Sequence, residues 1–279
     1  MLHVERMRAE DLPFAVQLTD HLDWELTKGD FEFMMELEPE GCFVLFDNSE
    51  RIGLTTSVSF GKIAWFGNLV VDEAHRNKGA GSLLVEHSID YLRSNRVQTI
   101  GLYAYAERIH FYKRLGFTYD SDFSVLTGRG LSSSLKPNVR PLQKSEVNRI
   151  VDHDHACFGA SRRKLLEPIM LDPDNLCYVL TEEEKVSGYV VAKMYRGVAE
   201  LGPLTCPEGR SDIAINLLKT TLDKLKGLEV SMLVPKKESE VLNMLKASGF
   251  TERFSVARMF NGPSLMDHCT FMPESLERG

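Results

Sequence analysis

Residues 68–92 read NLVVDEAHRNKGAGSLLVEHSIDYL. An apolar strand is followed here by a glycine-rich turn and then by a helix whose apolar residues recur along one face. Gly79 and Gly81 lie where the helix should begin, and the first backbone N–H groups of a helix have no acceptor within it. These donors and the positive end of the helix dipole favour an anion, and Arg76 and Lys78 add positive charge beside them. The turn is therefore suited to a pyrophosphate.

Two nucleotide-binding patterns do not fit this turn. The dinucleotide pattern needs a third glycine three residues after Gly81, where the chain has Leu84. The nucleoside-triphosphate loop needs a Gly-Lys-Ser/Thr sequence, which this chain lacks. A flexible connection with solvated basic residues is a further alternative.

The turn resembles the acyl-CoA signature of the GNAT N-acetyltransferase superfamily, Arg/Gln-x-x-Gly-x-Gly/Ala, which here spans residues 76–81. The sequence IHFYKRLGF at residues 109–117 is similar to the family's second signature, an aromatic pair followed by three residues, Gly and Phe. The resemblance implies acetyl-CoA as the cofactor, with its pyrophosphate on the turn and its pantetheine arm paired with the preceding strand. The cofactor-binding residues that it implies are Leu69, Val70, Val71, Arg76, Asn77, Lys78, Gly79, Ala80, Gly81, Ser82 and Tyr105, the last of which replaces an Asn of the family.

The implied reaction transfers an acetyl group to an amine. A lysine-like amine with a pKa of about 10.4 is neutral in only about one molecule in 2,500 at pH 7, so a proton must be removed from it. The resemblance makes Tyr112 the proton donor to the departing thiolate and the backbone N–H of Val70 the donor to the oxyanion. Core packing is the alternative role for Tyr112. No residue stands out as the general base: the candidates by position are Asp23, Glu25 and Asp72, and Asn68 could orient a water.

The segment DHLDWEL at residues 20–26 corresponds to the region that covers the acceptor cleft in this family. Trp24, with Asp23 and Glu25 on either side, would suit an amine on an apolar stem. A helix with one buried Trp and solvated acids is the alternative. Tyr103 and Tyr105 share one face of their strand and are expected to line the same cleft.

The chain repeats itself. A shift of 135 residues aligns identical residues at seven positions, and a shift of 133 aligns Gly116-Phe117 with Gly249-Phe250. The seven pairs are Val4/Val139, Cys42/Cys177, Val44/Val179, Leu45/Leu180, Gly53/Gly188, Gly67/Gly202 and Leu69/Leu204. We predict two α+β units in tandem, each a mixed twisted sheet with helices on both faces: a catalytic unit at residues 1–130 and a second at residues 131–279. The Gly- and Ser-rich residues 127–138 are the expected linker.

Both copies show the same order of predicted elements. In the first copy the expected strands are 2–7, 42–47, 51–60, 63–71 and 99–105, and the expected helices are 9–22, 81–95 and 108–116. The second copy lacks the turn. Residues 207–212, PEGRSD, take its place with Gly209 alone, and Leu245 aligns with Tyr112. The second unit is therefore expected to be degenerate in acetyl-CoA binding.

Composition limits the class of protein. The chain has 279 residues, 43% hydrophobic and 26% charged, which is enough for a packed core. A net charge of −7 without a Lys/Arg run argues against nucleic acid, and no apolar run approaches the length of a membrane helix. Five well-separated cysteines without a CxxC pattern indicate neither a disulfide framework nor a metal site. We predict a cytoplasmic monomer or homodimer.

The predicted function is transfer of the acetyl group of acetyl-CoA to an amine, carried out by the first unit. A non-catalytic acyl-CoA-binding or sensing protein is the alternative, and a scaffold that retains the turn from its ancestry is a third. The acceptor itself does not follow from the fold and the cofactor.

Overall fold

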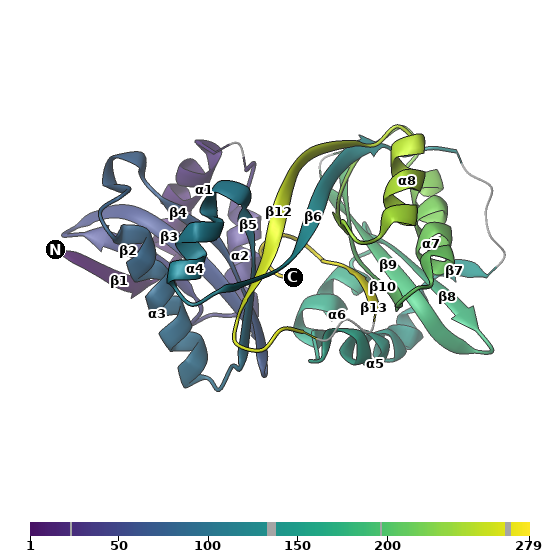
Figure 1. Cartoon of the computed structure of the whole chain (residues 1–279), viewed down its shortest axis with the longest axis horizontal. Helices are drawn as coiled ribbons and strands as arrows, with labels where there is room; N and C mark the ends of the chain where they lie inside the picture. Colours follow the sequence, from purple (N-terminus) through teal and green to yellow (C-terminus); the bar gives the residue numbers. More distant parts are fainter. Residues whose placement is uncertain (23, 133–137, 196, 266–268) are drawn as a thin grey trace.

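The computed structural model describes residues 1–22, 24–132, 138–195, 197–265 and 269–279. Among these residues, thirteen strands form one sheet in the order β1-β2-β3-β4-β5-β12-β6-β11-β10-β9-β8-β7, with β13 on β10. Figure 1 shows two lobes, each with its own helices, joined by the long strands β6 and β12. The fold is therefore two α+β units that share one sheet.

The first lobe contains the strands β1 (Leu2–Arg6), β2 (Cys42–Asp47), β3 (Glu50–Phe60), β4 (Ile63–Val71), β5 (Thr99–Tyr105) and β6 (Thr118–Arg129) in chain order. Its helices are α1 (Leu12–Asp20), α2 (Lys28–Leu37), α3 (Ala80–Ser94) and α4 (Ile109–Arg114), with short 3-10 turns η1 (Ala9–Asp11), η2 (Glu73–His75) and η3 (Ala106–Arg108). The expected helix at 9–22 is thus shorter and begins as η1. Helix α2 was not predicted, although Thr27 and Asp30 form a capping box at its start.

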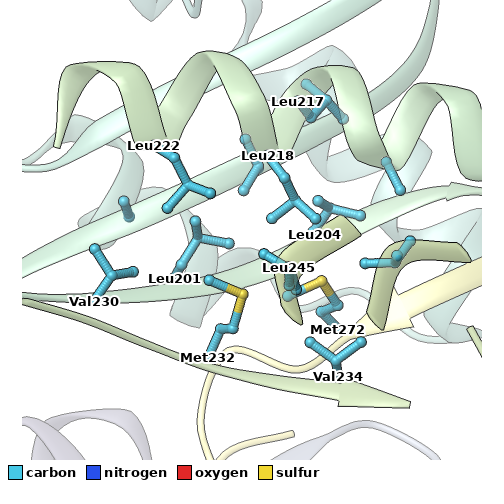
Figure 2. Close-up of a cluster of buried hydrophobic side chains, with 14 of the residues drawn as sticks. Leu201, Leu204, Leu217, Leu218, Leu222, Val230, Met232, Val234, Leu245 and Met272 are labelled. Carbon is cyan, nitrogen blue, oxygen red and sulfur yellow. The ribbon is translucent and has the colours of Figure 1, made fainter. Parts of the chain in front are cut away.

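The second part of the chain contains the strands β7 (Val139–Pro141), β8 (Leu176–Glu182), β9 (Lys185–Tyr195), β10 (Val198–Pro207), β11 (Glu229–Pro235), β12 (Thr251–Asn261) and β13 (Cys269–Met272). Its helices are α5 (Val147–Phe158), α6 (Arg163–Leu171), α7 (Ser211–Lys224) and α8 (Ser239–Ala247), with η4 (Lys144–Glu146). Figure 2 shows the leucines of α7 packed on the side chains of β10 and β11, a helix lying on a sheet.

The register of the strands confirms the predicted repeat. Leu45 pairs with Val4 on one side and with Gly53 on the other, and a bulge in β3 follows the Leu45–Gly53 pair. Its counterpart Leu180 pairs in the same way with Val139 and Gly188, and is followed by the same bulge. After α4 and after α8 the chain turns through left-handed glycines with φ of 85° and 87°, at Gly116 and Gly249.

The last strands of the two units are exchanged. β12 lies between β5 and β6, and β6 lies between β12 and β11, so each unit contributes a strand to the other's side of the sheet. The two exchanged strands are paired in equivalent ways. Val256 of β12 pairs with Tyr105, the last residue of β5, and Phe123 of β6 pairs with Pro235, the last residue of β11. The division at residue 130 therefore stays a prediction about the sequence repeat, because hydrogen bonds of the sheet cross it many times.

The linker prediction is wrong for residues 127–129, which belong to β6 and pair with β11. Close packing explains the glycines there better than flexibility does. A β-carbon at Gly128 would lie 2.6 Å from the ring of Phe250, and one at Gly130 would lie 2.0 Å from the carbonyl oxygen of Leu225. Residues 133–137 of the expected linker lie outside the described residues.

One disulfide contradicts the expectation that the cysteines are unpaired. Cys157 at the end of α5 is bonded to Cys269 at the start of β13, with 5.5 Å between their Cα atoms. Spacing along the sequence could not reveal the pair, because the two residues meet only when β13 folds back onto β10. Cys42 and Cys206 are free and buried, and Cys177 is free and partly buried.

No helix in the described ranges combines the length and the apolar character that crossing a membrane requires. The cytoplasmic location and the oligomeric state stay predictions.

Candidate functional site

Strands β4 and β5 separate partway along their length. They pair in parallel only from Ile63, opposite Thr99, to Trp65, opposite Gly101. A bulge in β4 follows, because Thr56 of β3 pairs with Gly67 whereas Leu54 pairs with Val70. The described chain therefore leaves the side of β4 that faces β5 without a strand partner beyond Trp65.

Asn68 forms the bulge and adopts a left-handed conformation with φ of 51°. Its side chain is buried, and its Nδ2 donates a hydrogen bond to Thr56 Oγ1 at 3.1 Å. Asparagine tolerates this backbone conformation better than most residues do. The first role of the Asn68 amide is thus to hold the bulge that opens the sheet.

The predicted turn lies at the end of the opened strand. Gly79 is the N-cap of α3 with φ of 87°, and no side chain caps the helix. The backbone bond from the Leu83 N–H to the Gly79 carbonyl, 3.0 Å long, is the first of the helix, so the N–H groups of the preceding residues have no acceptor within it. A β-carbon at Gly79 would meet no atom within 4 Å, which shows that the glycine is needed for its left-handed φ.

The two basic side chains of the turn have different positions. Arg76 lines the cavity described below, and its Nε donates to the Val71 carbonyl at 2.9 Å, which ties the turn to the end of β4. Lys78 instead donates to the Ala74 carbonyl at 2.9 Å and does not line the cavity. Asp72, a candidate base, caps η2 by accepting from the Ala74 N–H at 3.0 Å and is likewise absent from the cavity wall.

One cavity of about 1870 Å³ connects the turn, the opened strand and the space between the two units. It includes most of the residues that the sequence predicted for the site. Those lining it are Trp24, Glu25, Asn68, Leu69, Val70, Val71, Arg76, Asn77, Gly79, Gly81, Ser82, Tyr103, Tyr105 and Tyr112. Ala80 is buried behind the turn, and Asp23 lies outside the described residues.

Tyr112 lies on α4 and borders the cavity. Its ring makes edge-to-face contacts with Phe66, Phe111 and Phe117, with centroids 6.5, 5.0 and 5.8 Å away. Burial raises the pKa of Tyr112, and the positive charge of Arg108 opposes this rise only in part. The residue therefore both packs in the core and keeps a hydroxyl proton, the form that a proton donor needs.

Trp24 and Tyr105 both line the cavity and contact each other. Burial raises the pKa of Tyr105, and a hydrogen bond from Trp24 acts against it. The Tyr105 ring also lies 5.4 Å from the ring of Phe254 on β12. Tyr105 thus contacts residues of both units, and the cofactor contact that the sequence resemblance implied for it stays a prediction.

Sequence reasoning missed the part of the wall that the second unit provides. Strands β9, β10 and β12 and the segment after β13 bring Tyr195, Glu200, Arg253, Phe254, Glu277 and Arg278 to the cavity. The only signal in the sequence was that Gly67 aligns with Gly202. The segment after β13 packs closely against both of these glycines. A β-carbon at Gly67 would lie 2.6 Å from Glu277 Cα, and one at Gly202 would lie 2.1 Å from the Pro273 carbonyl oxygen.

A buried group of charges holds the segment. Glu274 is fully buried, and Arg278 Nε donates to its Oε2 at 2.7 Å while Lys193 donates to its Oε1. Burial alone would raise the pKa of Glu274, but the two cations lower it below its usual range. Lys193 also pairs with Glu200 at 2.8 Å. Among the described residues, no group of His, Cys, Asp and Glu side chains is arranged to hold a metal ion.

The second unit has the same kind of bulge, but its opening is filled. β13 pairs with β10 from Leu204 to Pro207, the residues that align with Leu69–Val71 of β4 and with Asp72 after it. Met272 of β13 lies in the core cluster with Leu204 and Val234 (Figure 2). At the start of α7, Arg210 pairs with Glu182 at 2.9 Å and with Asp212 at 2.8 Å. The chain's own strand thus occupies the position equivalent to the open edge of β4.

Comparisons with known proteins agree with this geometry. The sequence profile described as "Acetyltransferase (GNAT) family" matches residues 4–117, and that described as "Acetyltransferase (GNAT) domain" matches residues 150–270. The holothin acyltransferase of Pseudoalteromonas sp. (strain SANK 73390) is 25% identical over 242 residues, which cover 86% of this chain and 81% of that protein.

Solved structures share the fold across the whole chain. A putative acetyltransferase from Pyrococcus horikoshii superposes with a TM-score of 0.83 at 20% identity, covering 100% of this chain and 96% of that one. A tandem GNAT protein from the clavulanic acid biosynthesis pathway superposes with a TM-score of 0.63 at 10% identity, covering 95% and 100%. With both halves matched by GNAT profiles and the tandem architecture shared, the chain belongs to the GNAT acetyltransferase family as a tandem member with two GNAT domains.

Proposed function

We propose that the first unit, residues 1–130 with the exchanged β12, transfers the acetyl group of acetyl-CoA to an amine. One observation carries the proposal: the unpartnered edge of β4, the uncapped start of α3 and Tyr112 all border a single cavity. Bound acetyl-CoA supplies a thioester, so that a C–N bond forms and a C–S bond breaks at the same carbon.

The residues fit this cofactor at three points. Leu69, Val70 and Val71 offer backbone groups to an extended pantetheine arm, in the manner of an added strand. The open N–H groups from Gly79 to Ser82 and the charge of Arg76 suit a pyrophosphate. The cavity also continues beyond the bulge into the second unit, which leaves room for an acceptor.

Two groups of the chain act on the developing charges. A backbone N–H on the open side of β4 beside the bulge donates to the carbonyl oxygen as it gains negative charge. The Val70 N–H that the resemblance implied faces β3 instead, because Val70 pairs with Leu54 in the same register in which the Asp72 N–H donates to the Ile52 carbonyl. Tyr112 supplies its hydroxyl proton to the departing sulfur, since a tyrosine is protonated at neutral pH and burial extends that protonated range upward. Trp24 and Tyr105 form an aromatic wall for the apolar part of the acceptor.

Because β13 occupies the open edge of β10 in the second unit, we expect one acetyl-CoA to bind per chain. Gly79 and Gly209 offer a matched pair of variants, since both have a left-handed φ, 87° and 76°, and neither would bring a β-carbon within 4 Å of another atom. We expect Gly79→Ala to weaken acetyl-CoA binding about tenfold, because left-handed alanine costs about 1–2 kcal/mol and reorients the turn. Gly209→Ala should leave binding unchanged.

Isothermal titration of the parent and both variants with acetyl-CoA checks the stoichiometry and the affinities. Thiol release in the presence of a panel of primary amines then separates catalysis from binding alone. Two bound molecules per chain, or equal losses in the two variants, would contradict the assignment of the site to the first unit. Binding without thiol release for any amine would favour the sensing alternative.

A further inference from the structure

The segment Pro273–Gly279 carries a carboxylate into the first unit's cavity. The segment follows β13, which lies in the second unit, and then passes between the two lobes, where the C mark lies in Figure 1. Glu277 lines the cavity and is half-buried. A β-carbon at Gly67 would lie 2.6 Å from Glu277 Cα and 2.9 Å from Glu277 Cβ, so Glu277 presses on β4 at the residue before the bulge. Its side chain thus begins close to the opened strand that the proposed function assigns to the thioester.

Glu277 differs from the other carboxylates of the cavity wall. Glu200 is committed to Lys193 at 2.8 Å, and Asp30 caps α2 by accepting from the Thr27 N–H at 2.8 Å. The remaining carboxylates, Asp20, Glu25, Glu73 and Glu107, are exposed. No ion pair involves Glu277 within the part of the chain that the structure describes.

The backbone around Glu277 is held on both sides by other residues. Arg278 binds Glu274 through Nε at 2.7 Å, and Lys193 Nζ donates to the Glu274 carbonyl at 3.0 Å. Arg162 Nη1 donates to the Gly279 carbonyl at 2.6 Å. These bonds anchor the segment without using the Glu277 carboxylate, which is therefore positioned by the fold but left available to a ligand.

The charges that face Glu277 come from several elements. Its negative charge raises the pKa of Tyr105 on β5, after the larger effect of burial. It also contributes to the shifts of Glu200 on β10 and of Arg278 beside it, again after burial. Arg253 on β12 acts on Tyr105 from the other side. An amine held near Tyr105 would therefore lie within the electrostatic range of Glu277.

We propose that Glu277 binds the acceptor amine and takes its proton during acetyl transfer. This inference rests on the proposed function and adds the base that the sequence left open. The carboxylate accepts a hydrogen bond from the amine and receives its proton as the nitrogen attacks the thioester carbon, when that nitrogen becomes strongly acidic. The C–N bond forms and the C–S bond breaks, and the sulfur takes its proton from Tyr112. Glu277 then releases its proton to solvent, and Tyr112 regains one from solvent before the next turnover.

The test compares Glu277→Gln with Glu107→Gln, which changes an exposed carboxylate of the same cavity. Glutamine keeps the shape and the hydrogen bonding of the side chain but cannot take a proton. We expect Glu277→Gln to lower kcat/KM for primary amines by about 100-fold or more, with unchanged acetyl-CoA affinity and Tm. Glu107→Gln should stay within about twofold of the parent, and formate should partly restore Glu277→Ala.

Each outcome decides the inference. An active parent with Glu277→Gln within about threefold of it would overturn the role of Glu277 and leave the proposed function intact. A loss of acetyl-CoA binding or of several degrees of Tm in Glu277→Gln, with no rescue of Glu277→Ala by formate, would also overturn it, because that pattern marks a structural residue. A parent that releases no thiol with any amine would remove both proposals.

Discussion

Tyr112→Phe should lower the kcat for thiol release by about 10²- to 10⁴-fold, the usual contribution of a general acid. The change removes one hydroxyl from a ring that packs on Phe66, Phe111 and Phe117, so the core contacts remain. Acetyl-CoA affinity should change little, since the N–H groups that we propose bind the pyrophosphate lie at the start of α3. Steady-state kinetics with a primary amine, together with calorimetric titration of acetyl-CoA, measure the two effects.

Tyr195→Phe is the matched control, because Tyr195 borders the same cavity from β9 in the second unit. It should change the KM of the acceptor rather than kcat. An equal kcat for Tyr112→Phe and the parent would refute the donor role and leave Tyr112 as a packing residue.

The raised pKa of Tyr112 also fixes the direction of the pH dependence. A tyrosine is protonated below an ordinary pKa of about 10, and burial extends the protonated range upward in the folded state. Loss of the donor proton should therefore not reduce kcat until the pH exceeds that ordinary value. The same linkage contributes stability that is complete below pH 10 and declines as the pH rises toward the folded pKa.

Arg162→Met should lower the free energy of unfolding by about 3–5 kcal/mol, because it leaves the Asp154 carboxylate buried without its counter-charge. Both side chains are fully buried, with Arg162 Nη2 2.6 Å from Asp154 Oδ1 and Nε 3.0 Å from Oδ2. The Tyr189 hydroxyl completes the site by donating to Asp154 Oδ1 at 2.6 Å. The guanidinium also lies 4.5 Å above the ring of Phe158. Urea unfolding of the purified variant measures the loss.

The next residue provides the control. Arg163 forms an exposed pair with Glu167 at 3.7 Å, so Arg163→Met should cost less than about 1 kcal/mol. The double variant Asp154→Leu/Arg162→Met should recover part of the loss, because no lone charge remains buried. If Arg162→Met and Arg163→Met were equally stable, the buried pair would contribute nothing. Since Arg162 also binds the Gly279 carbonyl, acetyl transfer should fall together with stability in Arg162→Met but not in Arg163→Met.

The parts of the site that could be predicted are those encoded within one short stretch. The turn at residues 76–81 lies directly between its strand and its helix, so the chemistry of its glycines and N–H groups follows from local sequence. The repeat was predictable for the same reason, since Leu45 and Leu180 occupy equivalent places in equivalent hairpins. Tyr112 could be named only through resemblance, because nothing local distinguishes a buried tyrosine from one that faces a ligand.

The parts that could not be predicted depend on contacts between distant residues. β6 and β12 are equivalent in sequence, and either could complete either unit, so the pattern of apolar residues does not reveal the exchange. The strand β13 and the residues after it have no signature of their own. Glu277 approaches Gly67 because that segment is held by Lys193 of β9 and by Arg162 at the N-cap of α6. The Cys157–Cys269 bond depends on the same path of the chain.

Because β6 and β12 are exchanged, the stretch of sequence that is repeated is not the same as the set of strands that completes each folded unit. A piece ending near residue 130 would keep β6 but lack β12, and it would expose the hydrogen-bonding edge of β5 to other chains. The complementary piece would lack β6 and expose β11 in the same way. The two repeated sequences are therefore not self-sufficient, and the chain must be synthesised through β12 before the shared sheet is complete.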